Sequence, residues 1–251
     1  MDFCWIYVKN FSAYHKMGIF NELDYSIRSV KKNFMGESRC FVVGDDPELP
    51  DAIHVKAPPV VKMDRVTGQP VNLDLLNKLG AIIENPEINE EFILMYDDIF
   101  ILQPTTKEEL MTCYGRAEVI NPEAYIRTRN GGRPYKKLWV STYDYLVSYR
   151  LQRGLKTYDW ETHLPRYIEK GKMDWLIKSL NLRDIPKIPT SLYSGYYFED
   201  TTLVTPGLQS DIWTHKPGMD FDKEFACKFM NMYDDVIVQD FLNHMYERFG
   251  R

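Results

Sequence analysis

The chain has 251 residues, of which 44% are apolar and 27% charged, and its 31 basic side chains stand against 36 acidic ones for a net charge of −5. This composition excludes a largely disordered protein, and the acidic balance excludes a general attraction to nucleic acid or anionic lipid. The four cysteines are too widely spaced for a zinc site or a disulfide framework, no apolar run is long enough to span a membrane, and residues 1–10 lack the pattern of a signal peptide. We expect a cytoplasmic α/β protein with one domain and no membrane anchor.

The chain up to residue 102 alternates between two kinds of apolar pattern. Apolar, β-rich runs predict strands at residues 3–8, 39–43, 52–57 and 91–102. Apolar residues at helical spacing predict one helix capped by Asn21 and a second that begins at Asn72 and ends before Pro86. This alternation is typical of a doubly wound, mostly parallel sheet.

The strand expected at residues 91–102 carries two adjacent carboxylates, Asp97 and Asp98, inside an apolar run. Leaving them ionised and unpaired in a core is costly, so they need a cation, a basic partner or an opening to solvent. Oxygen ligands suit Mg²⁺ or Mn²⁺, which bind through one or two carboxylates together with substrate phosphates. We predict a metal site for a diphosphate, with Asp98 as the principal ligand. Alternatively, both aspartates begin a turn between two short strands and face water.

Polar residues also follow two of the other expected strands. Lys9 comes after the first strand, and Asp45 and Asp46 come after the second. Ligands of open α/β sheets bind beyond the carboxyl ends of the strands, so these residues are candidates for nucleotide contacts. The alternatives are a solvated Lys9 and a simple Asp-Pro turn.

Four blocks that occur in order have a familiar pattern, and they read NELDYSIRSVKKNF, RCFVVGDD, NLDLLNKLGAIIENPEI and EFILMYDDIFIL. Over residues 18–103 the chain resembles the Stealth-type capsular polysaccharide phosphotransferases and related GT-A glycosyltransferases of bacteria and their phages. It departs from their pattern at Tyr96, where Asn is usual. The resemblance implies a GT-A-like fold, a nucleotide-sugar donor and an acidic metal motif at Asp97 and Asp98. It also implies that Arg28 and Lys78 reach donor phosphates, although Arg28 is equally an exposed helix residue.

The segment from Tyr125 to Trp139 combines positive charge with aromatic rings around two glycines. Its basic residues are Arg127, Arg129, Arg133, Lys136 and Lys137. Such a loop suits a phosphate-rich or nucleic-acid acceptor, with Tyr135 or Trp139 stacking on a base, or a lid over a donor diphosphate. A solvated basic loop is the alternative.

A second chemical cluster contains Asp159, Glu161 and His163 at alternating positions before Pro165. If the segment is extended, its period of two places all three on one face, as a general base with a further metal ligand requires. A similar segment, with His before Pro, occurs in the resembling family. The alternative is a helix N-terminus with acidic caps and a buried histidine. His215 is a lesser metal-ligand candidate.

These features favour a metal-dependent glycosyl or sugar-phosphate transferase with a nucleotide-activated donor, in a bacterial or phage-infected cell. Residues 1–104 would form the donor half, and residues 105–251 the acceptor half with a C-terminal helix that starts at Asp234 and Asp235. The acceptor would be a glycan or a modified DNA base. Two other classes stay open: a palm-type nucleotidyl transferase, against which the charge of −5 argues, and a noncatalytic sugar-binding protein.

Overall fold

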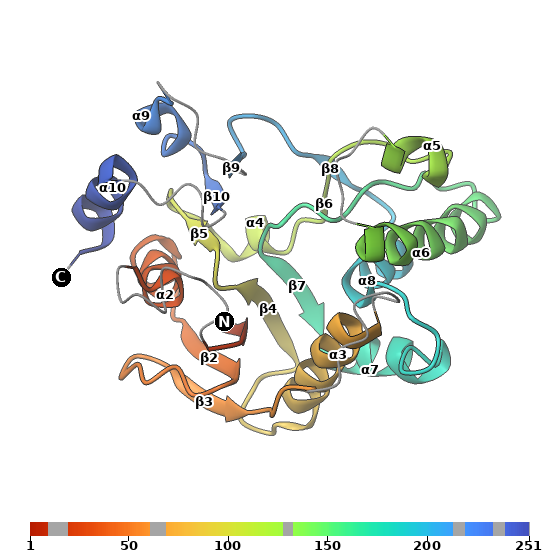
Figure 1. Cartoon of the computed structure of the whole chain (residues 1–251), viewed down its shortest axis with the longest axis horizontal. Helices are drawn as coiled ribbons and strands as arrows, with labels where there is room; N and C mark the ends of the chain where they lie inside the picture. Colours follow the sequence, from red (N-terminus) through yellow and green to blue (C-terminus); the bar gives the residue numbers. More distant parts are fainter. Residues whose placement is uncertain (10–19, 61–68, 128–132, 213–218, 233–238, 251) are drawn as a thin grey trace.

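The computed structural model describes residues 1–9, 20–60, 69–127, 133–212, 219–232 and 239–250. Its centre is a five-stranded sheet with the strand order β3-β2-β1-β4-β7 (Figure 1). The five strands are β1 (Asp2–Tyr7), β2 (Arg39–Gly44), β3 (Ile53–Lys56), β4 (Glu91–Tyr96) and β7 (Arg166–Glu169). The first four run parallel and β7 runs antiparallel to β4. The predicted α/β class with a mostly parallel sheet is confirmed.

The direction of winding changes at the middle of this sheet. From β1 the chain passes through α2 (Glu22–Asn33) to β2 and then outward to β3. It returns through α3 (Gln69–Glu84) to β4, which lies on the opposite side of β1. In open α/β sheets the ligand crevice lies beyond the carboxyl ends of the strands at such a switch point. The fold therefore points to the ends of β1 and β4.

Alternate residues of β1 enter two different cores, as the pleat of a strand requires. Phe3 and Trp5 pack with α2, and the Trp5 Nε1–H donates to Ser26 Oγ at 2.8 Å. Cys4 faces the other way and packs with α3. Both faces of the sheet are thus covered by helices, which explains why its strands are apolar at nearly every position.

Two helix starts were predicted from the capping residues Asn21 and Asn72, and the structure confirms the first but not the second. Asn21 caps α2 as expected, since its side chain accepts a hydrogen bond from the Asp24 backbone N–H at 3.2 Å. The prediction that Asn72 caps the next helix is wrong, because α3 already begins at Gln69 and Asn72 lies inside it. Pro70 lies in the first turn of α3, where proline is tolerated because the N–H that it lacks has no intrahelical partner there.

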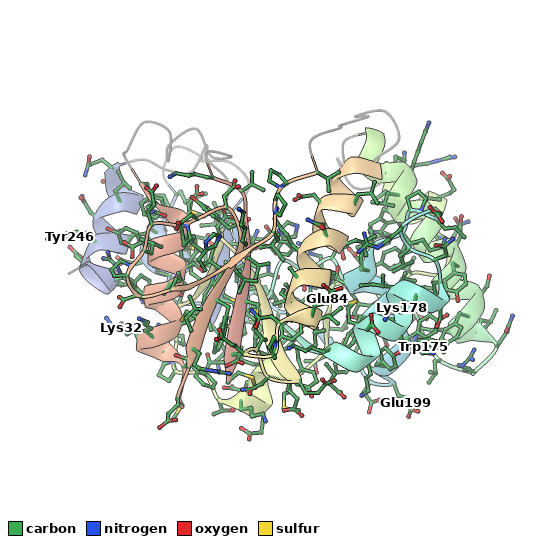
Figure 2. All side chains as sticks on the ribbon, turned by 90° about the horizontal axis from the view of Figure 1, so that it is seen from below. Lys32, Glu84, Trp175, Lys178, Glu199 and Tyr246 are labelled. Carbon is green, nitrogen blue, oxygen red and sulfur yellow. The ribbon has the colours of Figure 1, made fainter. Side chains whose placement is uncertain are left out.

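The middle of the chain packs on both sides of the sheet: Leu110 joins the core on the α2 side, whereas the helices between residues 122 and 197 join the core on the α3 side. Its elements are α4 (Lys107–Leu110), β6 (Tyr114–Gly115), α5 (Pro122–Arg127), α6 (Arg133–Leu151), α7 (Lys170–Ser179), α8 (Pro189–Tyr197) and β8 (Thr202–Leu203). Strands β6 and β8 form a two-stranded parallel sheet. Figure 2 shows α7, marked by Trp175 and Lys178, at the opposite end of the molecule from Tyr246.

The last part of the chain pairs with β5 to form a second, smaller sheet with the order β5-β10-β9, and two helices accompany it. Its elements are β5 (Ile99–Ile101), β9 (Gln209–Ile212), α9 (Phe221–Glu224), β10 (Phe229–Met232) and α10 (Gln239–Phe249). Helix α10 lies beside α2 (Figure 1), and Arg28 donates to the Phe249 carbonyl. The C-terminal helix is confirmed from Gln239 onward, whereas Asp234 and Asp235 lie outside the described residues.

Residues 91–102 are not one strand. β4 ends at Tyr96, Asp97 and Asp98 form a turn, and β5 leaves the central sheet to pair with β10. The alternative of a turn between two short strands is therefore the observed backbone. No helix in the described part of the chain is both long and apolar enough to cross a membrane.

Candidate functional site

The carboxyl ends of β1 and β2 meet in a set of polar contacts. The Lys9 backbone N–H donates to Asp45 Oδ2 at 2.8 Å, and the Lys9 ammonium lies 2.7 Å from Glu48. Burial, together with the charges of Asp97 and Asp45, raises the pKa of Tyr7 to about 12. The Tyr7 phenol thus lies near carboxylates that follow β2 and β4. The edge predicted for nucleotide contacts brings Lys9, Asp45 and Asp97 into one region.

Gly44 is the residue that allows these two strand ends to approach. Its φ is +134°, and a Cβ at this position would lie 2.1 Å from the Tyr7 carbonyl oxygen and 2.8 Å from the Lys78 side chain. Only glycine adopts such a backbone without a steric cost. The buried Lys78 therefore reaches the same edge, where its ammonium forms an ion pair with Asp74.

Asp98 is partly enclosed in the acidic turn. Its side chain is 23% exposed. Burial holds the pKa of Asp98 well above its usual range, and the charges of Asp97 and of Asp211 act in the same direction. A carboxylate in such surroundings gains from a bound cation or from a proton.

His163 lies opposite Asp98. Its Nδ1 is 4.0 Å from Asp98 Oδ2, and its ring centroid is 6.4 Å from that of Tyr96. The backbone of His163 has a φ of +50°, which is uncommon for a residue with a side chain and is found mostly where the surroundings impose it. Burial lowers the pKa of His163, so the imidazole is neutral near pH 7. A neutral imidazole can accept a proton, donate a hydrogen bond or bind a metal.

The predicted cluster does not lie on one face. Residues 159–163 have neither helical nor strand structure, so the helix N-terminus considered as an alternative is wrong. The Glu161 carboxylate accepts from Ser191 Oγ at 2.5 Å and from Arg166 at 3.3 Å. The pKa of Tyr96, raised to about 12 mainly by burial, responds to the charges of Glu161 and Asp98. Glu161 and His163 therefore belong to the region of Asp98.

Asp159 points elsewhere. It has no exposed surface and accepts hydrogen bonds from the Tyr125 and Tyr143 hydroxyls at 3.1 and 3.5 Å. The Glu161 backbone N–H also donates to it, at 3.2 Å. The expected alignment fails because the irregular backbone does not keep a period of two. Asp159 is enclosed among aromatic rings and does not face the acidic turn.

Arg28 and Asp46, which were predicted to contact the sugar donor, lie away from the acidic turn. Arg28 donates to Asp24 Oδ1 at 3.0 Å and to the Phe249 carbonyl at 3.1 Å, so it joins α2 to α10. Asp46 is exposed, and its side chain accepts from the Glu48 backbone N–H at 2.9 Å, which is the turn considered as an alternative. The structure does not bring either residue to the acidic pair.

The basic segment is largely helical and not a long loop. Residues up to Arg127 belong to α5, and those from Arg133 onward belong to α6. Trp139 has no exposed surface and stacks on Tyr143 at a centroid distance of 3.9 Å, so the prediction that it stacks on a base is wrong. Arg129, the Tyr135 side chain and His215 lie outside the described residues.

The sequence patterns missed two charged residues near the acidic turn. Asp211 on β9 acts on the pKa of Asp98, and it pairs with Arg116 at 2.6 Å. Arg116 also donates to the Glu161 carbonyl at 2.5 Å. Neither residue lies in a recognisable motif, and only the pairing of β9 with β10 and of β10 with β5 brings Asp211 to the site.

The acidic turn has the oxygen donors that a hard divalent cation requires. Within the described ranges, no group of three or more His, Cys, Asp or Glu side chains is placed to hold a metal ion. Mg²⁺ and Mn²⁺ do not need such a group, since they are usually held by one or two carboxylates, with water and substrate phosphates completing the shell. Asp97 and Asp98 fit this mode of binding.

Comparisons with known proteins find structural similarity to two solved structures at low sequence identity. No protein-family model and no curated protein matches the chain. It is similar to a solved structure of an active-site mutant of LgtC, with a TM-score of 0.46 and 9% identity over 98% of this chain and 95% of that one. It is also similar to the galactosyltransferase LgtC in complex with donor and acceptor sugar analogues, with a TM-score of 0.47 and 10% identity over 100% and 95%. At these values the likeness assigns no activity.

Proposed function

We propose that the chain is a metal-dependent glycosyl or sugar-phosphate transferase with a nucleotide-activated donor. The observation that carries the proposal is the position of Asp97 and Asp98, which follow β4 at the switch point of a mostly parallel sheet. Ligands bind at this place in open α/β sheets. The resemblance of residues 18–103 to GT-A glycosyltransferases implies the same class.

Asp97 and Asp98 would hold Mg²⁺ or Mn²⁺, which when bound neutralises the charge of the departing diphosphate. The raised pKa of Asp98 supports this role, because a nearby cation restores the ionised form that burial disfavours. Asp45 and Lys9, which share a hydrogen bond at the end of β1, would contact the nucleoside. Lys78, close to the same edge, would add positive charge beneath the phosphates.

Glu161 is the proposed general base. In the transfer, the bond between the sugar's anomeric carbon and the diphosphate oxygen breaks, a bond to the acceptor oxygen forms, and the acceptor's proton passes to Glu161. Ser191 and Arg166 both donate to Oε1 of Glu161 and so orient its carboxylate. Asp159 is enclosed by tyrosines, which makes it the weaker candidate. His163 would contact the donor or the metal from the side opposite the turn.

The acceptor in this proposal is a glycan. The charge of −5 and the burial of Trp139 both weigh against a nucleic-acid surface on α5 and α6. A salt series separates the two acceptors, because DNA binding weakens steeply with salt whereas binding of a neutral glycan does not. Tight DNA binding that falls with salt, and that is lost in a Lys136→Glu, Lys137→Glu variant, would instead favour a modified-DNA acceptor.

The test is a panel of nucleotide sugars, with nucleotide release measured in Mn²⁺ and in chelator. We expect release from one donor only with metal, and a loss of about 10²–10⁴-fold in turnover for Glu161→Gln at unchanged donor affinity. Glu199→Gln, which changes an exposed carboxylate, is the matched control. Metal-independent release, or equal turnover in both variants, would overturn the assignment. Consumption of nucleoside triphosphates on a primer would favour the palm-type class.

A further inference from the structure

Three consecutive backbone carbonyls of the Glu161–His163 segment are held by side chains from elsewhere in the chain. Arg116 donates to the Glu161 carbonyl at 2.5 Å. The Gln209 side-chain amide donates to the Thr162 carbonyl, and it lies 3.4 Å from the His163 carbonyl. A segment without helical or strand hydrogen bonds thus has its carbonyl groups satisfied by side chains from outside it.

The donors to these carbonyls are themselves joined in a continuous network. Gln209 donates to Asn231 Oδ1 at 2.7 Å, and Asn231 donates to Asp211 Oδ1 at 2.8 Å. The other oxygen of Asp211 accepts from Arg116 at 2.6 Å. We call Arg116, Gln209, Asp211 and Asn231 the carbonyl-binding network. It begins at the Glu161 carbonyl and returns to the Thr162 carbonyl.

Strand geometry explains why these residues meet. Gln209 and Asp211 are two positions apart on β9, so both side chains point to the same side of the strand. Asn231 on β10 is the register partner of Asp211. Arg116 directly follows β6, and its backbone N–H donates to the Asp159 carbonyl at 2.9 Å. The second sheet and β6 therefore hold the segment from two sides.

The network is costly to bury and rigid once formed. Asn231 has no exposed surface and Gln209 is 7% exposed, so each loses hydration that only good partners replace. Apolar residues of similar volume would pack the same space without this requirement. A fully satisfied polar network fixes one arrangement of the backbone. Here that arrangement includes His163, whose left-handed backbone is strained for a residue with a side chain and persists only when its surroundings impose it.

We propose that the carbonyl-binding network is a set of positioning residues, which fix the Glu161–His163 backbone and with it the positions of the Glu161 and His163 side chains relative to the acidic turn. This inference rests on the proposed function, because it explains how the base and the histidine are held in place for transfer. None of the four residues touches the reacting atoms in this role. A misplacement of reacting groups by about 1 Å can lower a rate about 10²-fold.

The test uses two variants of one network residue and a control from the same strand. Gln209→Glu keeps the shape and removes the N–H donors, and Gln209→Met keeps the length without any polar group. Ser210→Ala is the control, because Ser210 is buried on β9 but its hydroxyl bonds to Glu224 and not to the segment. If Gln209→Glu fails to fold, Gln209→Met carries the measurement.

Two readouts are needed. We expect kcat to fall about 10–100-fold in the Gln209 variants with the donor KM changed less than about 2-fold. We also expect faster amide hydrogen exchange in the peptide that covers residues 160–165. Ser210→Ala should change neither.

Each outcome decides the proposal. Unchanged exchange shows that the network does not hold the segment, and unchanged kcat with faster exchange shows that holding it does not matter for transfer; either result overturns the inference. If the wild-type protein transfers no sugar, the proposed function fails and with it the catalytic meaning of the network. The exchange result, which needs no substrate, still shows whether the network holds the backbone.

Discussion

Replacing Asp98 by Asn should stabilise the metal-free protein and abolish stabilisation by metal. Burial, reinforced by the charge of Asp97, raises the pKa of Asp98 in the folded state. Because the pKa of Asp98 is higher in the folded than in the unfolded state, its contribution to the free energy of unfolding is complete below the unfolded pKa of about 3.9. This contribution is lost as the pH rises through the folded pKa. At neutral pH, well above the unfolded pKa, the enclosed carboxyl group therefore lowers the free energy of unfolding, whereas Asn has no such effect.

The expected magnitude follows from the partial enclosure of this side chain. Because Asp98 is 23% exposed, we expect a gain of about 1–2 kcal/mol and not the full cost of a buried ion. In a chain of this size that corresponds to a rise in Tm of about 2–8 °C. Mn²⁺ at about 100 times its Kd should stabilise the wild-type protein by about 2.7 kcal/mol and the variant hardly at all.

The assay is thermal and denaturant unfolding near neutral pH, in chelator and in Mn²⁺. Asp200→Asn, which changes an exposed carboxylate, controls for the loss of one negative charge. An Asp98→Asn protein that is less stable than wild type in chelator would refute the electrostatic reasoning. An equal gain from Mn²⁺ in both proteins would refute the assignment of the metal ligand.

Two further predictions concern stability alone. Gly44→Ala should lower the free energy of unfolding by about 3 kcal/mol or more, measured with denaturant, because its Cβ would meet the Tyr7 carbonyl at 2.1 Å. Gly207→Ala is the control, since nothing lies within 4 Å of a Cβ there, and it should cost less than about 1 kcal/mol. Equal costs for the two variants would contradict the steric argument. Hydrogen bonds to the Asp240 carbonyl and to Asp222 raise the pKa of His244, so its contribution is complete below about pH 6.5 and is lost as the pH rises through the folded pKa. His244→Ala should therefore destabilise by up to about 1 kcal/mol near pH 5.5 and by less near pH 9, and a pH-independent difference would contradict this.

The central sheet could be predicted because its signal is local. The strands at residues 39–43 and 52–57 and the cap at Asn21 follow from apolar patterning and side-chain chemistry within a few residues. The break after Tyr96 could not be predicted in the same way. The two halves of residues 91–102 are equally apolar, and what separates them is the pairing of β5 with β10, a strand near the end of the chain.

The same distinction applies to the candidate site. Asp97, Asp98, Lys9 and Asp45 follow strands, so a parallel sheet brings them together without further information. The directions in which the Asp159 and Glu161 side chains point depend on an irregular backbone, and sequence spacing does not predict them. The Asp211 position depends on a sheet whose strands are far apart in sequence, and it was therefore missed.

The turn at Asp97 and Asp98 also joins two sheets that are otherwise built from different parts of the chain. One wall of the site belongs to the early strands, and the other belongs to β9 and β10. One face of the smaller sheet, through Ile99, Ile101 and Phe229, packs in the same core as Phe3 and Trp5 of the central sheet, whereas its other face packs with α9 and α10. In the proposed transferase, the acidic turn would be the fixed point between these two walls, and the shared core would couple substitutions in one wall to the packing of the other.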